Sequence, residues 1–130
     1  MRIDHVGYAV RRMEKAVRAF EALGYQFEES VDDPDRNIRI RFGQKDGYRI
    51  ELVQPLSREM LSPVDTYLRR VGSMPYHFCY RSDAFERDID DLCGKGFQVL
   101  NAPQPAMAFS GKRVVFLIHP AVGMMELVEE

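Results

Sequence analysis

The sequence predicts an α+β fold of two tandem βαβββ modules, in which a curved mixed sheet carries its helices on the outer face. The first supporting observation is an internal repeat, since His5 precedes Gly24 by the same 19 positions that separate His77 from Gly96. The second is that each half closes on an apolar strand with one embedded acid, RIELV and then MMELV. The two halves therefore share a register, which indicates a duplicated unit.

The first module, residues 1–54, is expected to begin with a strand and a helix. In IDHVGYAV, bulky residues alternate with small or polar ones, which is the period of a strand. Apolar residues then recur at helical spacing until Gly24, a residue type that commonly ends helices. Three further strands are predicted at YQFEESV, NIRIRF and YRIELV, because turn-rich segments separate these runs.

Residues 55–75 are interpreted as a connector between the modules. Prolines punctuate the segment, and SPVDTYLRRVG predicts a short helix with Ser62 as its cap and Pro63 at its first position. No strand pair is expected here.

The second module, residues 76–130, repeats the order of the first. YHFCY predicts the opening strand, and Asp83 with Glu86 predicts a capping box before the helix. The remaining strands are predicted at FQVLNA, AMAFS, RVVFLI and GMMELVEE. A chain of 130 residues can build one core of ordinary size, so both modules are assigned to a single domain, 1–130.

Strand parity places four potential metal ligands on one side of the predicted sheets. Each embedded acid points away from its apolar neighbours, and each histidine lies on the small or polar side of its opening strand. Since the helices are expected to pack against the bulky side of each sheet, the opposite side is expected to carry His5, Glu51, His77 and Glu126. If the two sheets join and curl with helices outside, these side chains point into one cup.

This set of residues favours a divalent metal site. A lone strand histidine is more often a hydrogen-bonded core residue, and a lone strand glutamate usually faces solvent. Four residues at duplicated positions with consistent parity are much harder to assign to chance. Two imidazoles and two carboxylates suit Zn, Co, Ni, Mn or Fe, and an octahedral ion would keep two positions for substrate or water. The sequence does not select among these metals.

Composition excludes several other classes of function. The net charge is -2 and the basic residues are dispersed, which argues against a nucleic-acid partner. No apolar run approaches the length of a membrane span, and the chain opens without a basic and apolar leader. Cys79 and Cys93 are too far apart for a CxxC pair. We therefore expect a soluble, cytoplasmic protein with reduced thiols and no membrane partner.

The repeated strand motifs and the four potential ligands together resemble those of the vicinal oxygen chelate superfamily, which includes glyoxalases, bleomycin resistance proteins and dioxygenases. The resemblance is greatest to the methylmalonyl-CoA epimerase family, with glyoxalase I more distant. It covers essentially the whole chain and rests on IDHVGYAV, LGY, IELVQPL, SPVDTYL, PYHFCY, GKRVVFL and MMELVE. The resemblance implies a glyoxalase-like fold around a divalent ion held by the four potential ligands. In the epimerase family the second ligand position can be glutamine, and here it is Glu51.

The resemblance also implies two acid/base carboxylates on opposite sides of the reacting carbon. Glu126 matches one of them. Asp35 falls where the family usually carries a glutamate, so its side chain is one methylene shorter. A plain turn residue among neighbouring acids and proline is an equally good interpretation of Asp35. Ser110 is a second departure, because the family motif HGK is here SGK.

We expect an enzyme that forms an enolate alpha to a thioester carbonyl, namely a metal-dependent epimerase or racemase of a small molecule such as an acyl-CoA. One alternative is a glyoxalase I-type (lactoylglutathione) lyase, which uses the same enolate chemistry on a hemithioacetal. The other is a non-catalytic small-molecule binding or resistance protein, although such proteins commonly lose the metal ligands. A homodimer is expected because the open sheet edges of paired modules need cover.

Overall fold

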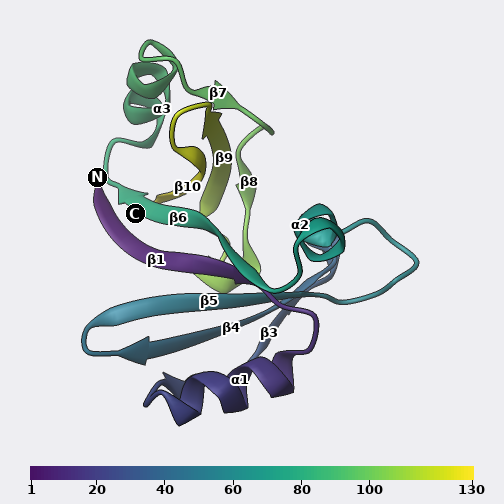
Figure 1. The fold of residues 1–130 in the computed structure, drawn as a ribbon. Coiled ribbons are helices and arrows are strands. Elements are labelled where there is room, and N and C mark those ends of the chain that lie inside the picture. The colour runs from purple at the N-terminus through teal and green to yellow at the C-terminus, as the bar shows by residue number, and fades with distance from the viewer. The chain divides into compact units, whose positions relative to one another are not determined.

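The computed structural model describes all 130 residues of the chain (Figure 1). The chain divides into two compact units. The N-terminal unit is His5–Tyr76, and the C-terminal unit combines Met1–Asp4 with His77–Glu130. Both units contain parallel and antiparallel strand pairs, which confirms the predicted α+β class with a mixed sheet.

The N-terminal unit follows the predicted order of strand, helix and further strands. Its elements are β1 (Arg2–Ala9, which begins in the other unit), α1 (Met13–Ala22), β2 (Gln26–Phe27), β3 (Val31–Asp33), the 3-10 helix η1 (Pro34–Arg36), β4 (Ile38–Lys45), β5 (Tyr48–Pro55) and α2 (Asp65–Arg70). Strand β5 pairs in parallel with β1 and antiparallel with β4. Strand β4 in turn pairs with the short β2 and β3.

The core of this unit lies between α1 and the strands. The buried residues of the cluster are Val10, Met13, Val17, Ile50 and Leu52. Tyr8 and Phe20 pack against them with their rings edge-on, 5.2 Å between centroids. Each fully buried aliphatic side chain of this kind contributes about 1.5–3 kcal/mol. The bulky side of β1 and β5 is therefore the helix-covered side, as strand parity predicts.

The C-terminal unit repeats this arrangement. Its elements are β6 (Met74–Ser82, which begins in the other unit), α3 (Phe85–Cys93), β7 (Gln98–Val99), β8 (Gln104–Pro105), the 3-10 helix η2 (Met107–Phe109), β9 (Arg113–His119) and β10 (Gly123–Glu129). Strand β10 pairs in parallel with β6 and antiparallel with β9. Its core residues are Phe85, Val115, Leu117, Met125 and Leu127. This matches the N-terminal unit strand for strand and confirms the duplication.

Three predicted strands differ from the structure. Of FQVLNA only Gln98–Val99 forms a strand, β7, and the short β8 that follows was not predicted. YQFEESV forms two short strands, β2 and β3, because the exposed acids Glu28 and Glu29 lie between them. AMAFS was predicted as a strand but forms η2. The backbone of Ser110 and Gly111 has positive φ, 55° and 82°, and this left-handed pair turns the chain where a strand would continue.

The predicted starts of α2 and α3 are also wrong in detail. Helix α2 begins at Asp65, and the carboxylate of Asp65 accepts a hydrogen bond from the Ser62 backbone N–H at 2.7 Å. At α3 the N-cap residue is Ala84, which makes no side-chain capping bond, so the capping box predicted for Asp83 and Glu86 does not form. The Ser82 hydroxyl accepts a hydrogen bond from the Ala84 N–H at 3.0 Å instead. None of the helices has the length and apolar character needed to cross a membrane.

Candidate functional site

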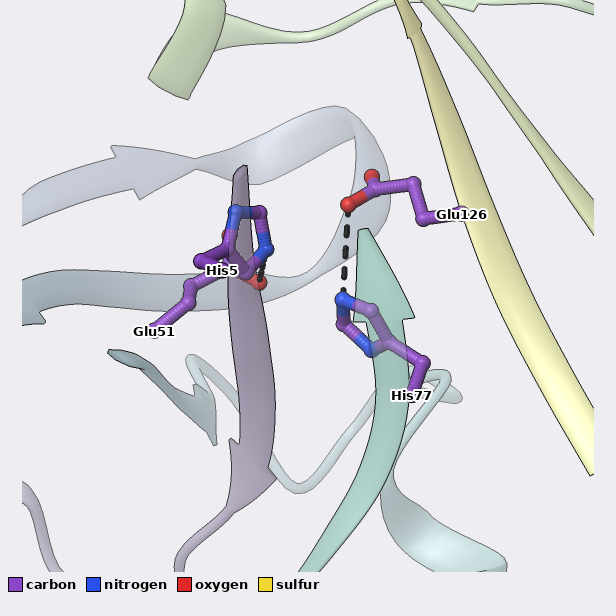
Figure 2. Close-up of side chains that lie close together, drawn as sticks. All are labelled: His5, Glu51, His77 and Glu126. Atoms are coloured by element: carbon purple, nitrogen blue, oxygen red, sulfur yellow. Dashed lines mark hydrogen bonds and ion pairs between the residues drawn. The ribbon is translucent and has the colours of Figure 1, made fainter. Parts of the chain in front are cut away.

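The first histidine–glutamate pair lies on the side of the N-terminal strands that α1 does not cover. The parallel register of β1 and β5 sets Gly7 beside Glu51, and His5 precedes Gly7 by two residues on the same side. His5 and Glu51 are consequently diagonal neighbours. Both are buried, and the His5 Nε2 atom lies 3.2 Å from the Glu51 Oε2 atom (Figure 2).

The second pair has the same construction in the C-terminal unit. The register of β6 and β10 sets Cys79 beside Glu126, and His77 precedes Cys79 by two residues. Both residues of the pair are buried, and the His77 Nε2 atom lies 3.3 Å from the Glu126 Oε2 atom (Figure 2). The duplication therefore reproduces the side-chain geometry as well as the strand order.

A phenylalanine ring packs against each imidazole ring, a contact that was not predicted from the sequence. Phe42 lies opposite Glu51 in the β4–β5 register, and its ring meets the His5 ring edge-on at 5.4 Å. Phe116 lies opposite Glu126 and meets the His77 ring at the same 5.4 Å distance. The signal was present in the sequence, because a phenylalanine occurs in the strand before each acid, 9 residues before Glu51 and 10 residues before Glu126.

Phe42 also connects the first pair to a cation. The Arg49 guanidinium lies 3.8 Å from the centroid of the Phe42 ring, a cation–π contact. Arg49 precedes Glu51 by two residues on β5, so both residues belong to the same side of the strand. The Phe42 ring thus contacts both the imidazole of the first pair and the guanidinium of Arg49.

The donor atoms of each pair suit a divalent cation. A buried carboxylate is unfavourable unless a proton, a cation or hydrogen bonds compensate its charge. Two donors about 2.1 Å from one ion lie about 3.0 Å apart at a right angle and about 3.4 Å apart at the tetrahedral angle. The observed distances of 3.2 and 3.3 Å fall between these limits. The four buried side chains are therefore potential metal ligands.

Asp35 belongs to neither pair. It lies on η1, is exposed to solvent, and makes no hydrogen bond or ion pair. Next to it, Asp33 is buried and lies 3.9 Å from the Arg36 guanidinium. The structure places Asp35 in a turn, where its carboxylate is open to a ligand from solvent.

Arg39 and Arg41, which alternate with the apolar residues of β4, are engaged by the protein itself. Arg39 donates two hydrogen bonds to the Asp32 carboxylate, at 2.7 and 3.1 Å. These bonds lower the pKa of Asp32 below its ordinary value. Arg41 donates to the Glu28 carbonyl oxygen at 2.7 Å. Both arginines thus fix the edge of the sheet.

The fold and these paired ligands are those of a known superfamily. The model of the glyoxalase/bleomycin resistance protein/dioxygenase superfamily matches residues 4–120. The chain belongs to this superfamily, which confirms the family inferred from its motifs.

Its relatives within that superfamily include epimerases. The chain is 31% identical over 122 residues to the ethylmalonyl-CoA/methylmalonyl-CoA epimerase of Cereibacter sphaeroides, a match that covers 92% of this chain and 88% of the relative. It is 32% identical over 122 residues to the mitochondrial methylmalonyl-CoA epimerase of Homo sapiens, covering 92% of this chain and 66% of that protein.

A solved structure of an epimerase is also similar to this chain. The methylmalonyl-CoA epimerase of Streptomyces coelicolor, in complex with 2-nitronate-propionyl-CoA, superposes with a TM-score of 0.81 at 25% identity. That match covers 100% of this chain and 97% of the other. The relatives are enzymes, and this chain is an enzyme of the same epimerase-like type.

Proposed function

We propose that the protein is a divalent-metal-dependent isomerase that inverts the carbon alpha to the thioester carbonyl of a 2-substituted acyl-CoA. The observation that carries this proposal is the pair of buried His–Glu contacts, equal in geometry and register, in a chain related to methylmalonyl-CoA epimerases. An enolate is the intermediate expected when a proton leaves that carbon.

In this proposal one ion is held by both pairs, His5 with Glu51 and His77 with Glu126. The set offers two imidazole nitrogens and two carboxylate groups, which suits Zn, Co, Ni, Mn or Fe. The bound ion supplies Lewis acidity that stabilises negative charge on the thioester oxygen. The edge-on rings of Phe42 and Phe116 keep the two imidazoles in their orientations.

Two carboxylates move the proton. Glu126 serves one face of the reacting carbon, and its burial keeps competing water away. Asp35 serves the opposite face, and its exposed position on η1 leaves it accessible to a substrate. Proton transfer requires each carboxylate to come within hydrogen-bond reach of the α carbon.

Exchange of the α proton in D2O tests this function. The protein is first stripped of metal and then reloaded with each candidate ion, and NMR follows methylmalonyl-CoA and other 2-substituted acyl-CoAs. We expect exchange with reloaded protein and none with stripped protein. Exchange that continues unchanged without metal would remove the proposed mechanism. Turnover of a methylglyoxal–thiol adduct, with no exchange in any acyl-CoA, would instead assign a glyoxalase I-type lyase.

A further inference from the structure

The side of the N-terminal strands that carries the first His–Glu pair also carries an arginine. In the parallel register of β1 and β5, Glu51 lies beside Gly7. His5 and Arg49 are each two residues earlier on their strands, so they are neighbours on that same side. The Arg49 side chain is partly buried, with 23% exposed. A cation therefore lies next to an imidazole that the proposed function assigns to a divalent ion.

Contacts with Phe42 and Glu28 position the Arg49 guanidinium. Its central carbon lies 3.8 Å from the centroid of the Phe42 ring, and that ring meets the His5 ring at 5.4 Å between centroids. A terminal nitrogen of Arg49 lies 3.9 Å from the Glu28 carboxylate, whose side chain is 55% exposed, so this ion pair is weak. The contact with Phe42 keeps the guanidinium on the side of the sheet that carries the pair.

The C-terminal unit has an apolar residue at the equivalent position. Met124 precedes the acid of its unit by two residues, as Arg49 does in the other unit. The residues paired with these two positions differ in the same way, because Gln44 lies opposite Arg49 and Ile118 lies opposite Met124. The duplicated strands thus carry a polar, cationic end beside the first His–Glu pair and an apolar end beside the second.

The charge of Arg49 disfavours a divalent ion at the first pair. Like charges repel, and one guanidinium at a partly exposed position is expected to weaken the binding of a divalent ion by about tenfold. Met124 shows that this position of the duplicated strand accepts an uncharged side chain. The presence of a cation is therefore best explained by the ligand that the first pair receives together with the ion.

We propose that Arg49 is a specificity-determining residue, which draws negative charge on the substrate to the first His–Glu pair and stabilises it there. The proposal rests on the proposed function, in which negative charge builds up on the thioester oxygen as the α proton leaves. A guanidinium that is already fixed stabilises such charge without reorganisation. Met124 and Ile118 offer no such stabilisation, so the second pair receives a less polar part of the substrate.

Metal titration of the stripped protein tests the effect of the charge without turnover. Arg49→Met introduces the residue of the equivalent position, keeps a flexible side chain against the Phe42 ring and removes the charge. Its Kd for Zn²⁺, measured in competition with a chromogenic chelator, should fall by about tenfold. Arg49→Lys keeps the charge and should leave this Kd within about twofold of wild type. A Kd that is unchanged or higher in Arg49→Met would overturn the inference.

Arg41→Met is the matched control, since it changes the net charge by the same amount. The Arg41 guanidinium also lies over a phenylalanine, at 5.9 Å from the centroid of the Phe27 ring. Arg41 pairs with Leu52, however, and therefore belongs to the side of the sheet that α1 covers. Its replacement should leave the Kd for Zn²⁺ within about twofold. An equal decrease in Arg41→Met and Arg49→Met would indicate a general effect of net charge and overturn the inference.

Turnover distinguishes an electrostatic role of Arg49 from a structural one. At saturating metal, Arg49→Met should lower the rate of α-proton exchange in methylmalonyl-CoA by about tenfold or more, although it binds the ion more tightly. Arg49→Lys should retain most of the wild-type rate. Equal losses of rate in the two variants, or weaker metal binding together with a lower rate in Arg49→Met, would identify Arg49 as structural support for Phe42 and overturn the inference.

Failure of this inference and failure of the proposed function give different results. Wild-type protein that binds no metal, or that exchanges no α proton when loaded, would reject the isomerase and the role of Arg49 with it. Metal-dependent exchange in the wild type, with the same rate and the same Kd in Arg49→Met, would support the isomerase and reject the role of Arg49.

Discussion

Glu51 and Glu126 occupy equivalent positions in the two units, but the proposed chemistry gives them unequal roles. Both are buried beside an imidazole, at 3.2 and 3.3 Å. In the proposed mechanism Glu51 acts only as a ligand, whereas Glu126 is also an acid/base group. Glutamine has nearly the same shape as glutamate and keeps an oxygen donor, so the two substitutions to glutamine separate these roles.

We predict that Glu51→Gln retains metal and keeps the exchange rate within about tenfold of wild type, since the epimerase family accepts glutamine at this position. Glu126→Gln removes a proton acceptor and should lower the rate by about 10²–10⁴-fold. Proton exchange measured by NMR, together with metal content, checks both variants. Equal losses of activity in the two variants would contradict the division of roles.

Asp35 gives a second prediction at the level of one residue. Asp35→Asn should lower proton exchange by about 10²-fold or more if its carboxylate moves the proton. Asp35→Glu restores the side-chain length usual in the family and should keep or raise the rate. Asp46→Asn, at another exposed turn position, is the control. Wild-type rates in both Asp35 variants would identify Asp35 as a turn residue only.

At the scale of elements, the alternation of side chains along the strands could be read from the sequence. Ile50 and Leu52 lie in the core under α1, and Glu51 between them points to the other side. Met125 and Leu127 flank Glu126 in the same way under α3. Side chains along a strand alternate between its two sides with a period of two residues. An acid between two apolar residues can therefore be assigned to the side opposite the core before the fold is known.

Helix starts and short edge elements could not be predicted equally well, because several polar groups compete locally for the same backbone atoms. Near α2, Ser62 and Asp65 both offer oxygens, and Asp65 makes the bond. Near α3, Ser82 and Asp83 are adjacent candidates, and the Ser82 hydroxyl accepts the bond. Differences of a few tenths of a kcal/mol decide such competitions. The aromatic rings beside the imidazoles were missed because they depend on strand pairing.

The segment after β5 depends on one buried side chain, which leads to a third prediction. Asn37→Asp keeps the size of the side chain but removes the amide that donates to Ser57 and Met60. It also sets a charge against carbonyl oxygens, so we expect a loss of about 2–3 kcal/mol in the free energy of unfolding. Urea denaturation measures this loss.

Asn37→Gly serves as its comparison. The backbone at Asn37 has a φ of 54°, which glycine adopts without strain, so this variant removes the side chain alone. It should be less destabilising than Asn37→Asp while still loosening the segment. Greater stability in Asn37→Asp than in Asn37→Gly would contradict the proposed role of the amide.

For the molecule as a whole, the exposed carboxylates around Arg113 make one contribution to stability in acid. Its guanidinium donates to Glu129 and Glu86 and holds the pKa of both carboxyl groups below the ordinary 4.5. Because both groups titrate lower in the folded chain, their contribution is fully present above pH 4.5. It is lost as the pH falls through the lowered values.

We therefore predict that Arg113→Gln returns the pKa of Glu86 and Glu129 toward 4.5 and moves acid unfolding to a higher pH. NMR titration of the two carboxyl groups and circular dichroism across the acid range measure these changes. Arg87→Gln, which removes an exposed cation from α3, should leave both unchanged. Unshifted carboxyl pKa values in Arg113→Gln would show that the contacts are not maintained in solution.

The repeated diagonal placement of histidine and glutamate also has an evolutionary consequence. Each unit carries one complete pair, so two copies of a single ancestral unit would already provide the same four donors as a symmetric assembly. Once two such copies are fused into one chain, their sequences can differ from each other. The residue beside the acid is glycine in one copy, Gly7, and cysteine in the other, Cys79. The two halves of this chain therefore keep the same His–Glu pair, while the residue beside the acid differs.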